Sequence, residues 1–184
     1  MVIDTVPTGQ PPANQLYRLI LTRPVTIQSV NSVDQVVTTA SDANIVRKYY
    51  FGYTASESDY LALQLKTDAR DQGWATEPQR GLWSWFEIAI LGSAPQTGAI
   101  VTEDQIKRDN TGNLCTWLSH TIPLTKTYTE QTGPVFDANH PLWKNLEKGN
   151  VISVLVVAQF SQWKGDVRRG NLAIEELVEE PIPL

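Results

Sequence analysis

The chain has 184 residues, of which 41% are hydrophobic and 19% are charged, a composition typical of a folded globular protein and not of a disordered one. This length fits a single domain, because β-domains often reach it without dividing. The formal net charge of −5 argues against a nucleic-acid-binding protein, since neutralising phosphates requires a concentrated surface of lysine and arginine.

Residues 1–14 are rich in proline, glycine, threonine and glutamine, and we expect them to form a flexible lead-in to a domain of residues 15–184. Within this domain apolar residues recur with a period of two, which marks strands with one buried face. The segment 151–160 is instead apolar on both faces, as expected of a central strand that is covered on both sides. Strands are predicted at 15–22, 25–30, 46–53, 60–67, 83–91, 114–124, 151–160 and 171–180.

The last of these segments, 171–180, suits a strand or a short helix, and its alternation favours the strand. One helix is predicted at 140–149, where Pro141 suits the first turn and Gly149 offers a C-terminal stop. Many strands, one short helix and no internal repeat predict an all-β fold, a single-domain β-sandwich of the jelly-roll kind. Long loops, where a site is expected, are predicted at 67–82, 92–113 and 125–140.

The cysteine content and the termini bear on the compartment. Cys115 is the single cysteine, which excludes an internal disulfide. The first residues lack the basic start and apolar run of a signal peptide, and no apolar run reaches the length of a membrane span. We therefore expect a cytoplasmic protein, or one exported without a classical signal peptide.

Three of the six tryptophans lie within DQGWATEPQRGLWSWFEIAIL, residues 71–91. Trp83 and Trp85 share one face of their strand with Glu87, so that either an arginine pairs with the carboxylate or this face is partly exposed. In the core interpretation, the corner at Gly73 caps aromatic rings that are buried beneath it. In the ligand interpretation, a sugar stacks on an indole while polar groups bond its hydroxyls.

The stretches DQGW at 71–74, WSWFE at 83–87 and LEKGNVISVLVVAQFSQWKGDVRRGNL at 146–172 resemble a β-sandwich module common in fungal proteins. That module stands alone or is attached to ankyrin-type and other regulatory regions. The resemblance implies the fold and brings no catalytic residues. The chain departs from the family pattern at Arg70 (His in the family), Asn150 (Asp), Gln159 (Arg) and Ser161-Gln162 (Pro-Gly), and its loop between Trp74 and Trp83 is shorter.

Sequence patterns of catalysis and of metal binding are lacking. No serine lies in a nucleophile-elbow pattern, no glycine-rich loop suits a phosphate, and the two histidines show no metal-site spacing. We therefore predict a non-catalytic, lectin-like module without cofactor or metal. Its partner would be a carbohydrate or glycoconjugate rather than a nucleic acid, and a homodimer would raise its avidity. The predicted ligand-binding residues are Asp71, Gln72, Trp74, Arg80, Trp83 and Trp163.

Two other functions are open at this stage. The same tryptophans could face a protein partner or a lipid surface, which would require exposed indoles with few polar groups beside them. An enzyme with a non-standard site would instead use Glu87 or Asp71 together with His120 for acid–base chemistry, and would require a shifted pKa in a pocket.

Overall fold

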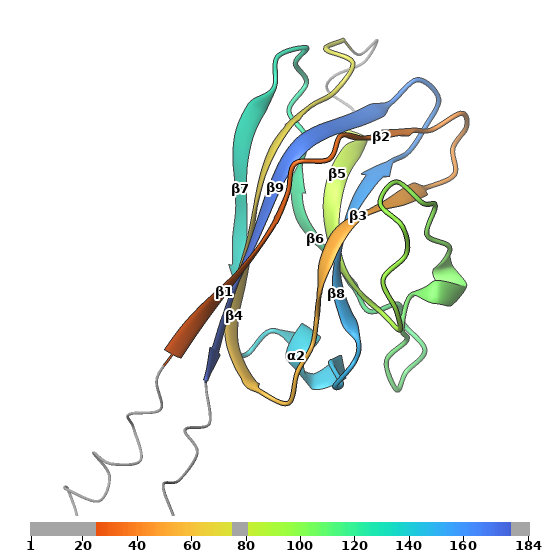
Figure 1. The fold of residues 1–184 in the computed structure, drawn as a ribbon. Helices are drawn as coiled ribbons and strands as arrows, with labels where there is room; N and C mark the ends of the chain where they lie inside the picture. The colour runs from red at the N-terminus through yellow and green to blue at the C-terminus, as the bar shows by residue number, and fades with distance from the viewer. Residues whose placement is uncertain (1–24, 75–80, 178–184) are drawn as a thin grey trace, which may run out of the picture.

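Two antiparallel sheets pack face to face around one core (Figure 1). The computed structural model describes residues 25–74 and 81–177, so the predicted lead-in at 1–14 and the predicted strand at 15–22 lie outside the described residues. The first sheet contains β1 (Val25–Ser32), β2 (Val36–Thr39), β4 (Asp59–Arg70), β7 (Thr129–Phe136) and β9 (Lys164–Leu177). The second contains β3 (Val46–Thr54), β5 (Ser84–Leu91), β6 (Thr116–Thr121) and β8 (Val151–Ala158).

The strand order is that of a jelly roll. The first sheet runs β1-β9-β4-β7, and the second runs β3-β8-β5-β6. The short strand β2 pairs with the beginning of β9, and β1 pairs with the remainder of the same strand. Because β1 and β2 lie end to end along β9, they act as one interrupted strand, which leaves four interleaved strands in each sheet. The predicted all-β sandwich is confirmed.

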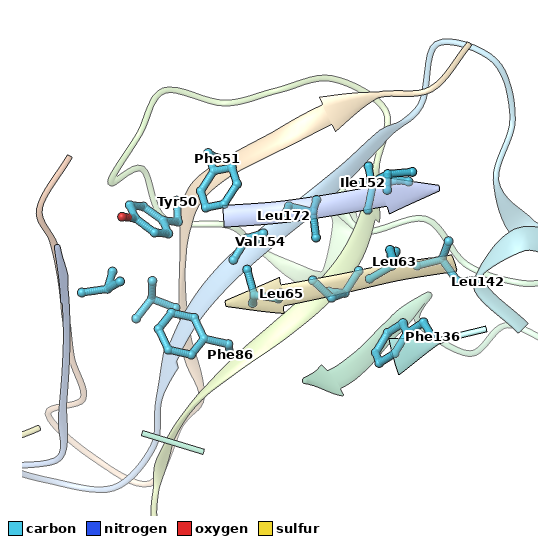
Figure 2. Packing of buried hydrophobic residues seen from close by; sticks show 14 of the residues in the cluster. Tyr50, Phe51, Leu63, Leu65, Phe86, Phe136, Leu142, Ile152, Val154 and Leu172 are labelled. Atoms are coloured by element: carbon cyan, nitrogen blue, oxygen red, sulfur yellow. The ribbon is translucent and has the colours of Figure 1, made fainter. Parts of the chain in front are cut away.

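The core lies between the sheets and follows the period of two that the sequence shows. Leu63 and Leu65 of β4 point inward, and they meet Phe86 of β5 and Val154 of β8 from the opposite sheet (Figure 2). Alternate residues of a strand face opposite sides, so each strand contributes every second residue to this layer. Leu63, Leu65 and Phe86 are almost completely buried, as this arrangement requires.

A second apolar layer covers the outer face of the second sheet. Every residue of β8 is buried, as predicted for a strand covered on both sides. The outer cover is the long connection that follows β5, which includes the 3-10 turn η2 (Glu103–Gln105). Val101 and Ile106 from this connection pack on Leu155 of β8. Backbone hydrogen bonds fasten it, with the Val101 N–H donating to the Arg47 carbonyl over 2.9 Å.

Three predictions about local structure were wrong. The predicted loop at 125–140 contains β7, an edge strand whose Gly133 and Pro134 break the alternating pattern, and Pro is tolerated at an edge. The strand β2 was missed, because four residues are too few to show a period. The stretch 160–170 was expected to be a loop, yet β9 begins at Lys164 and spans 14 residues.

The predicted helix is present but short. Helix α2 (Pro141–Asn145) begins at the expected proline, and the side chain of His140 accepts a hydrogen bond from the Leu142 N–H as its N-cap. Among the described residues, no helix is long and apolar enough to span a membrane.

Gly170, on the inner face of β9, is expected to tolerate no side chain. A Cβ there would lie 2.5 Å from Cε1 of Phe51 and 2.7 Å from Cε1 of Tyr50, two rings locked in the core. Replacing Gly170 by Ala should therefore lower the free energy of unfolding by about 1–3 kcal/mol through overpacking. Urea denaturation measures this loss, and Gly92→Ala, which would meet no atom within 4 Å, is the matched control. Equal stability of the two variants would contradict the prediction.

Candidate functional site

The corner that follows β4 presents an exposed tryptophan. Asp71 begins the corner, and its Oδ1 accepts a hydrogen bond of 2.7 Å from the N–H of Gly73, whose φ of +75° is the left-handed conformation that favours glycine. Trp74 follows with a side chain that is half exposed, at 50%. The sequence DQGW therefore forms the tight turn that its residues predict.

Asp71 lies beneath this corner and is only 4% exposed. Its Oδ2 has no hydrogen-bond partner within the described part of the chain. Burial raises the pKa of this carboxyl above its usual value, although hydrogen bonds from the backbone of Gly73 and Thr125 act in the opposite direction. A buried acceptor without a partner is costly, so this carboxylate is a place where a donor would be bound favourably.

Gln72 ties the corner to the beginning of β9. Its Nε2 donates to the Trp74 carbonyl over 3.0 Å, and its Oε1 accepts from the Lys164 N–H over 3.1 Å. Gly73 packs directly on the backbone of Lys126, where a Cβ would lie 2.9 Å from the amide nitrogen. The corner is thus held from three sides, and Trp74 projects from a fixed backbone.

The turn between β8 and β9 lies at the same end of the sandwich, opposite α2 (Figure 1). Phe160 in this turn has a φ of 66° and packs edge-on against Trp83, with ring centroids 4.6 Å apart. The Gln159 N–H donates to the Trp83 carbonyl over 2.9 Å. Trp163, in contrast, is only 9% exposed, and its ring offers no broad surface to a ligand.

The structure brings together most of the residues that the sequence singled out. Asp71, Gln72 and Trp74 form the corner, and Gln72 joins it to the strand that follows Trp163. Trp83 is half-buried beside the β8–β9 turn. Arg80 lies outside the described residues.

A charged cluster beside the corner was not predicted. The guanidinium groups of Arg70 and Arg168 cover the two faces of the Tyr128 ring, with Cζ atoms 4.2 and 4.3 Å from its centroid. Asp166 is 1% exposed and accepts hydrogen bonds from Tyr128 at 2.9 Å, from Gln35 at 2.8 Å and from Arg70 at 3.0 Å. These partners come from four separate segments, so no local motif signalled the cluster.

The balance of forces on Asp166 shows how firmly this cluster is built. Burial alone raises the pKa of the carboxyl, but the hydrogen bonds from Gln35, Tyr128 and Arg70, together with the charge of Lys164, outweigh burial and lower the pKa below its ordinary value. Asp166 is therefore ionised at neutral pH and anchors the cations around it.

Glu87 has a structural partner. Its carboxylate accepts hydrogen bonds from Arg47 Nε at 2.7 Å, from Trp85 Nε1 at 2.9 Å and from Thr116 Oγ1 at 2.9 Å. The pair is almost wholly buried, with 9% of each side chain exposed. Of the two alternatives for this face of β5, pairing with an arginine is the one observed.

His120 lies on the other side of the second sheet from Glu87. Its Nε2 is 2.8 Å from Thr67 Oγ1 and its Nδ1 is 2.9 Å from Ser119 Oγ, and its ring lies beside Phe86 of the inner core. Burial lowers its pKa to about 4. A base this weak, with both nitrogens engaged by hydroxyls, is poorly suited to accept a proton at neutral pH. Within residues 25–74 and 81–177, no group of three His, Cys, Asp or Glu side chains is placed to hold a metal ion.

Comparisons with known proteins add little to this geometry. No family model matches the chain, and no curated protein is significantly similar to it. The crystal structure of the decameric BFDV capsid protein is similar at a TM-score of 0.31 with 11% identity, over 83% of this chain and 100% of that one. The 60-mer BFDV capsid protein is similar at a TM-score of 0.29 with 12% identity, over 89% and 98%.

Likenesses this distant carry no argument about this chain, and the fold class rests on its own sheets. The resemblance to the fungal module stays a prediction.

Proposed function

We propose that the protein is a non-catalytic, lectin-like module that binds a carbohydrate at the corner formed by residues 71–74. The observation that carries the proposal is the half-exposed indole of Trp74 on a backbone that neighbouring residues hold in place. The apolar face of a sugar ring packs on such an indole, and a platform that is already ordered loses little conformational entropy on binding. Trp74 would be the stacking surface, and Asp71 and Gln72 would hold it in position.

The surroundings of Trp74 favour a sugar over a lipid surface. A lipid-binding indole would have few hydrogen-bonding groups beside it, whereas Trp74 adjoins the Gln72 amide, the exposed Lys126 and the half-exposed Lys164. These donors suit the hydroxyl and ring oxygens of a carbohydrate. Trp83, whose edge packs on Phe160, would supply a second apolar wall where the ligand extends toward the β8–β9 turn.

Replacing Trp74 by Ala is expected to weaken glycan binding by about tenfold or more, because a central tryptophan typically contributes a large share of binding free energy. The measurement is isothermal titration with neutral and acidic tetrasaccharides, and with phosphatidylcholine vesicles as the lipid arm. Stability should change little, since the side chain is exposed.

Trp143→Phe is the matched control, because Trp143 stacks on Tyr60 at the other end of the sandwich. Binding to vesicles alone would contradict the sugar proposal. So would glycan binding that is indifferent to Trp74. Sedimentation velocity on the same samples would test whether a homo-oligomer supplies the avidity that lectins often use.

A further inference from the structure

A β-bulge in β9 turns two consecutive arginines to one face. Asp68 of β4 pairs with Arg169, and the next residue of β4, Ala69, pairs with Val167, so Arg168 is the extra residue. Consecutive residues of a regular strand face opposite sides, but here both guanidinium groups reach the same oxygen. Arg168 Nε lies 2.8 Å and an Nη of Arg169 3.1 Å from Asp68 Oδ2 on the outer face of the first sheet.

On this face the carboxylates are buried and the cations are exposed. The side chains of Asp68 and Asp166 are 11% and 1% exposed, whereas those of Arg168 and Arg169 are 46% and 63% exposed. Because the negative groups lie below and the positive groups above, solvent meets a cationic surface on a chain whose formal net charge is −5. We call this surface the basic track; its cations are Lys66, Arg70, Lys126, Lys164, Arg168 and Arg169.

The basic track begins at the Trp74 corner. Arg70 Nη1 donates to the Lys126 carbonyl at 3.2 Å, and the N–H of Lys164 holds the corner through Gln72. From Arg70 the outer face of β4 continues through Asp68 to Lys66, which at the rise of a strand is roughly 13 Å. An open groove of about 250 Å³ lies at the far end, lined among others by Lys66, Asp68, Glu130, Arg169 and Asn171.

We propose that the ligand is an acidic glycan, with one sugar stacked on Trp74 and its carboxylate or sulfate groups on the basic track. This inference rests on the proposed function and names the class of sugar. Guanidinium groups bind carboxylate and sulfate oxygens in a planar, two-pronged manner, and each arginine of the bulge has donors beyond the one that Asp68 accepts. The carboxylates in the groove, Asp68 and Glu130, would accept hydrogen bonds from sugar hydroxyls.

The same surface is less suited to a nucleic acid. Single strands bind where successive bases stack on aromatic rings along a cationic groove. Both faces of Tyr128 are occupied by the guanidinium groups of Arg70 and Arg168. Among the described residues, Trp74 and Phe160 are the exposed aromatic side chains, and neither lies in the groove at the far end of the track.

The test uses four probes on the full-length protein: a heparin tetrasaccharide, tetragalacturonate, cellotetraose and decathymidylate. Titration should give at least one acidic tetrasaccharide a Kd about tenfold or more below that of cellotetraose, and this advantage should shrink as salt screens the charges. Lys66→Glu/Arg169→Glu should weaken the acidic probe by about tenfold or more and leave cellotetraose unchanged. Lys144→Glu/Lys148→Glu, at and just after α2 at the other end, is the matched control.

Should the double variant fail to fold, Lys66→Glu alone keeps the test, because Lys66 is exposed on the sheet surface. Equal affinity for acidic and neutral tetrasaccharides, still dependent on Trp74, would overturn this inference and leave the proposed function standing. If no glycan binds, both fall. Tighter binding of decathymidylate than of either acidic glycan would assign the track to nucleic acid and overturn the inference.

Discussion

Replacing Glu87 by Ala is expected to lower the free energy of unfolding by about 3–5 kcal/mol, because it leaves the charge of Arg47 buried without a partner. Arg47 Nε and Glu87 Oε2 are 2.7 Å apart. The variant also removes the acceptor for the Trp85 indole and the Thr116 hydroxyl, two donors that the carboxylate satisfies in the wild type.

The consequence should extend to the cover of the second sheet. The backbone of Arg47 holds Val101 of the long connection that follows β5, and Val101 packs in the outer apolar layer with Tyr49 and Leu155. An unpaired Arg47 would seek solvent and disturb this layer. Faster hydrogen exchange of the Val101 amide in Glu87→Ala would report that disturbance directly.

Urea denaturation measures the predicted loss. Glu103→Ala is the matched control, since Glu103 lies in an exposed pair with Arg108 at 3.9 Å and should change stability by less than about 1 kcal/mol. The double replacement Arg47→Met/Glu87→Leu should recover much of the loss, because a buried pair is often replaceable by apolar residues of similar volume. A Glu87→Ala variant as stable as the control would show that the pair is hydrated.

Acidification from pH 6.5 to about pH 4 is expected to cost about 3 kcal/mol of stability through His120. Burial lowers the pKa of its imidazole to about 4 in the folded protein, against 6.5 for an unperturbed histidine. Between these values the unfolded chain binds a proton that the folded chain does not. Stability is therefore complete above pH 6.5 and is lost as the pH falls through this window.

The environment of His120 explains the direction of this effect. In the neutral ring one nitrogen donates and the other accepts, which suits hydroxyl partners on both sides, at Thr67 and Ser119. A second ring proton would meet one of these hydroxyls as a competing donor, beside the apolar ring of Phe86. The cationic form is thus opposed by burial and has no carboxylate among its contacts.

Denaturation curves for the wild type and for His120→Gln, recorded from pH 7.5 to 4, isolate the effect. The variant should lose most of the slope in this window. His140→Gln should retain it, because His140 has a pKa that burial lowers less far and that Asp137 partly restores. Asp71, whose pKa is raised, contributes with the opposite sign and is common to all three proteins. A slope unchanged in His120→Gln would place the acid sensitivity elsewhere.

The sequence by itself determined the features that depend on neighbouring residues. Alternation placed the central strands and their inward faces, and the apolar run VISVLVVA predicted a strand buried on both sides. The Asp71–Gly73 turn followed from residue chemistry, because the aspartate side chain bonds the backbone two residues on and glycine accepts a positive φ. The cost of burying a lone carboxylate likewise required a partner for Glu87, without saying which one.

The tertiary structure decided everything that depends on pairing between distant segments. Arg47 is 40 residues from Glu87, and Arg168 is 100 residues from Asp68, separations that no local period encodes. The edge strand β7 carried no alternating signal, because an edge needs fewer buried side chains. The bulge that turns Arg168 and Arg169 to one face arises from the register between β4 and β9, and register is set by long-range packing rather than by either strand alone.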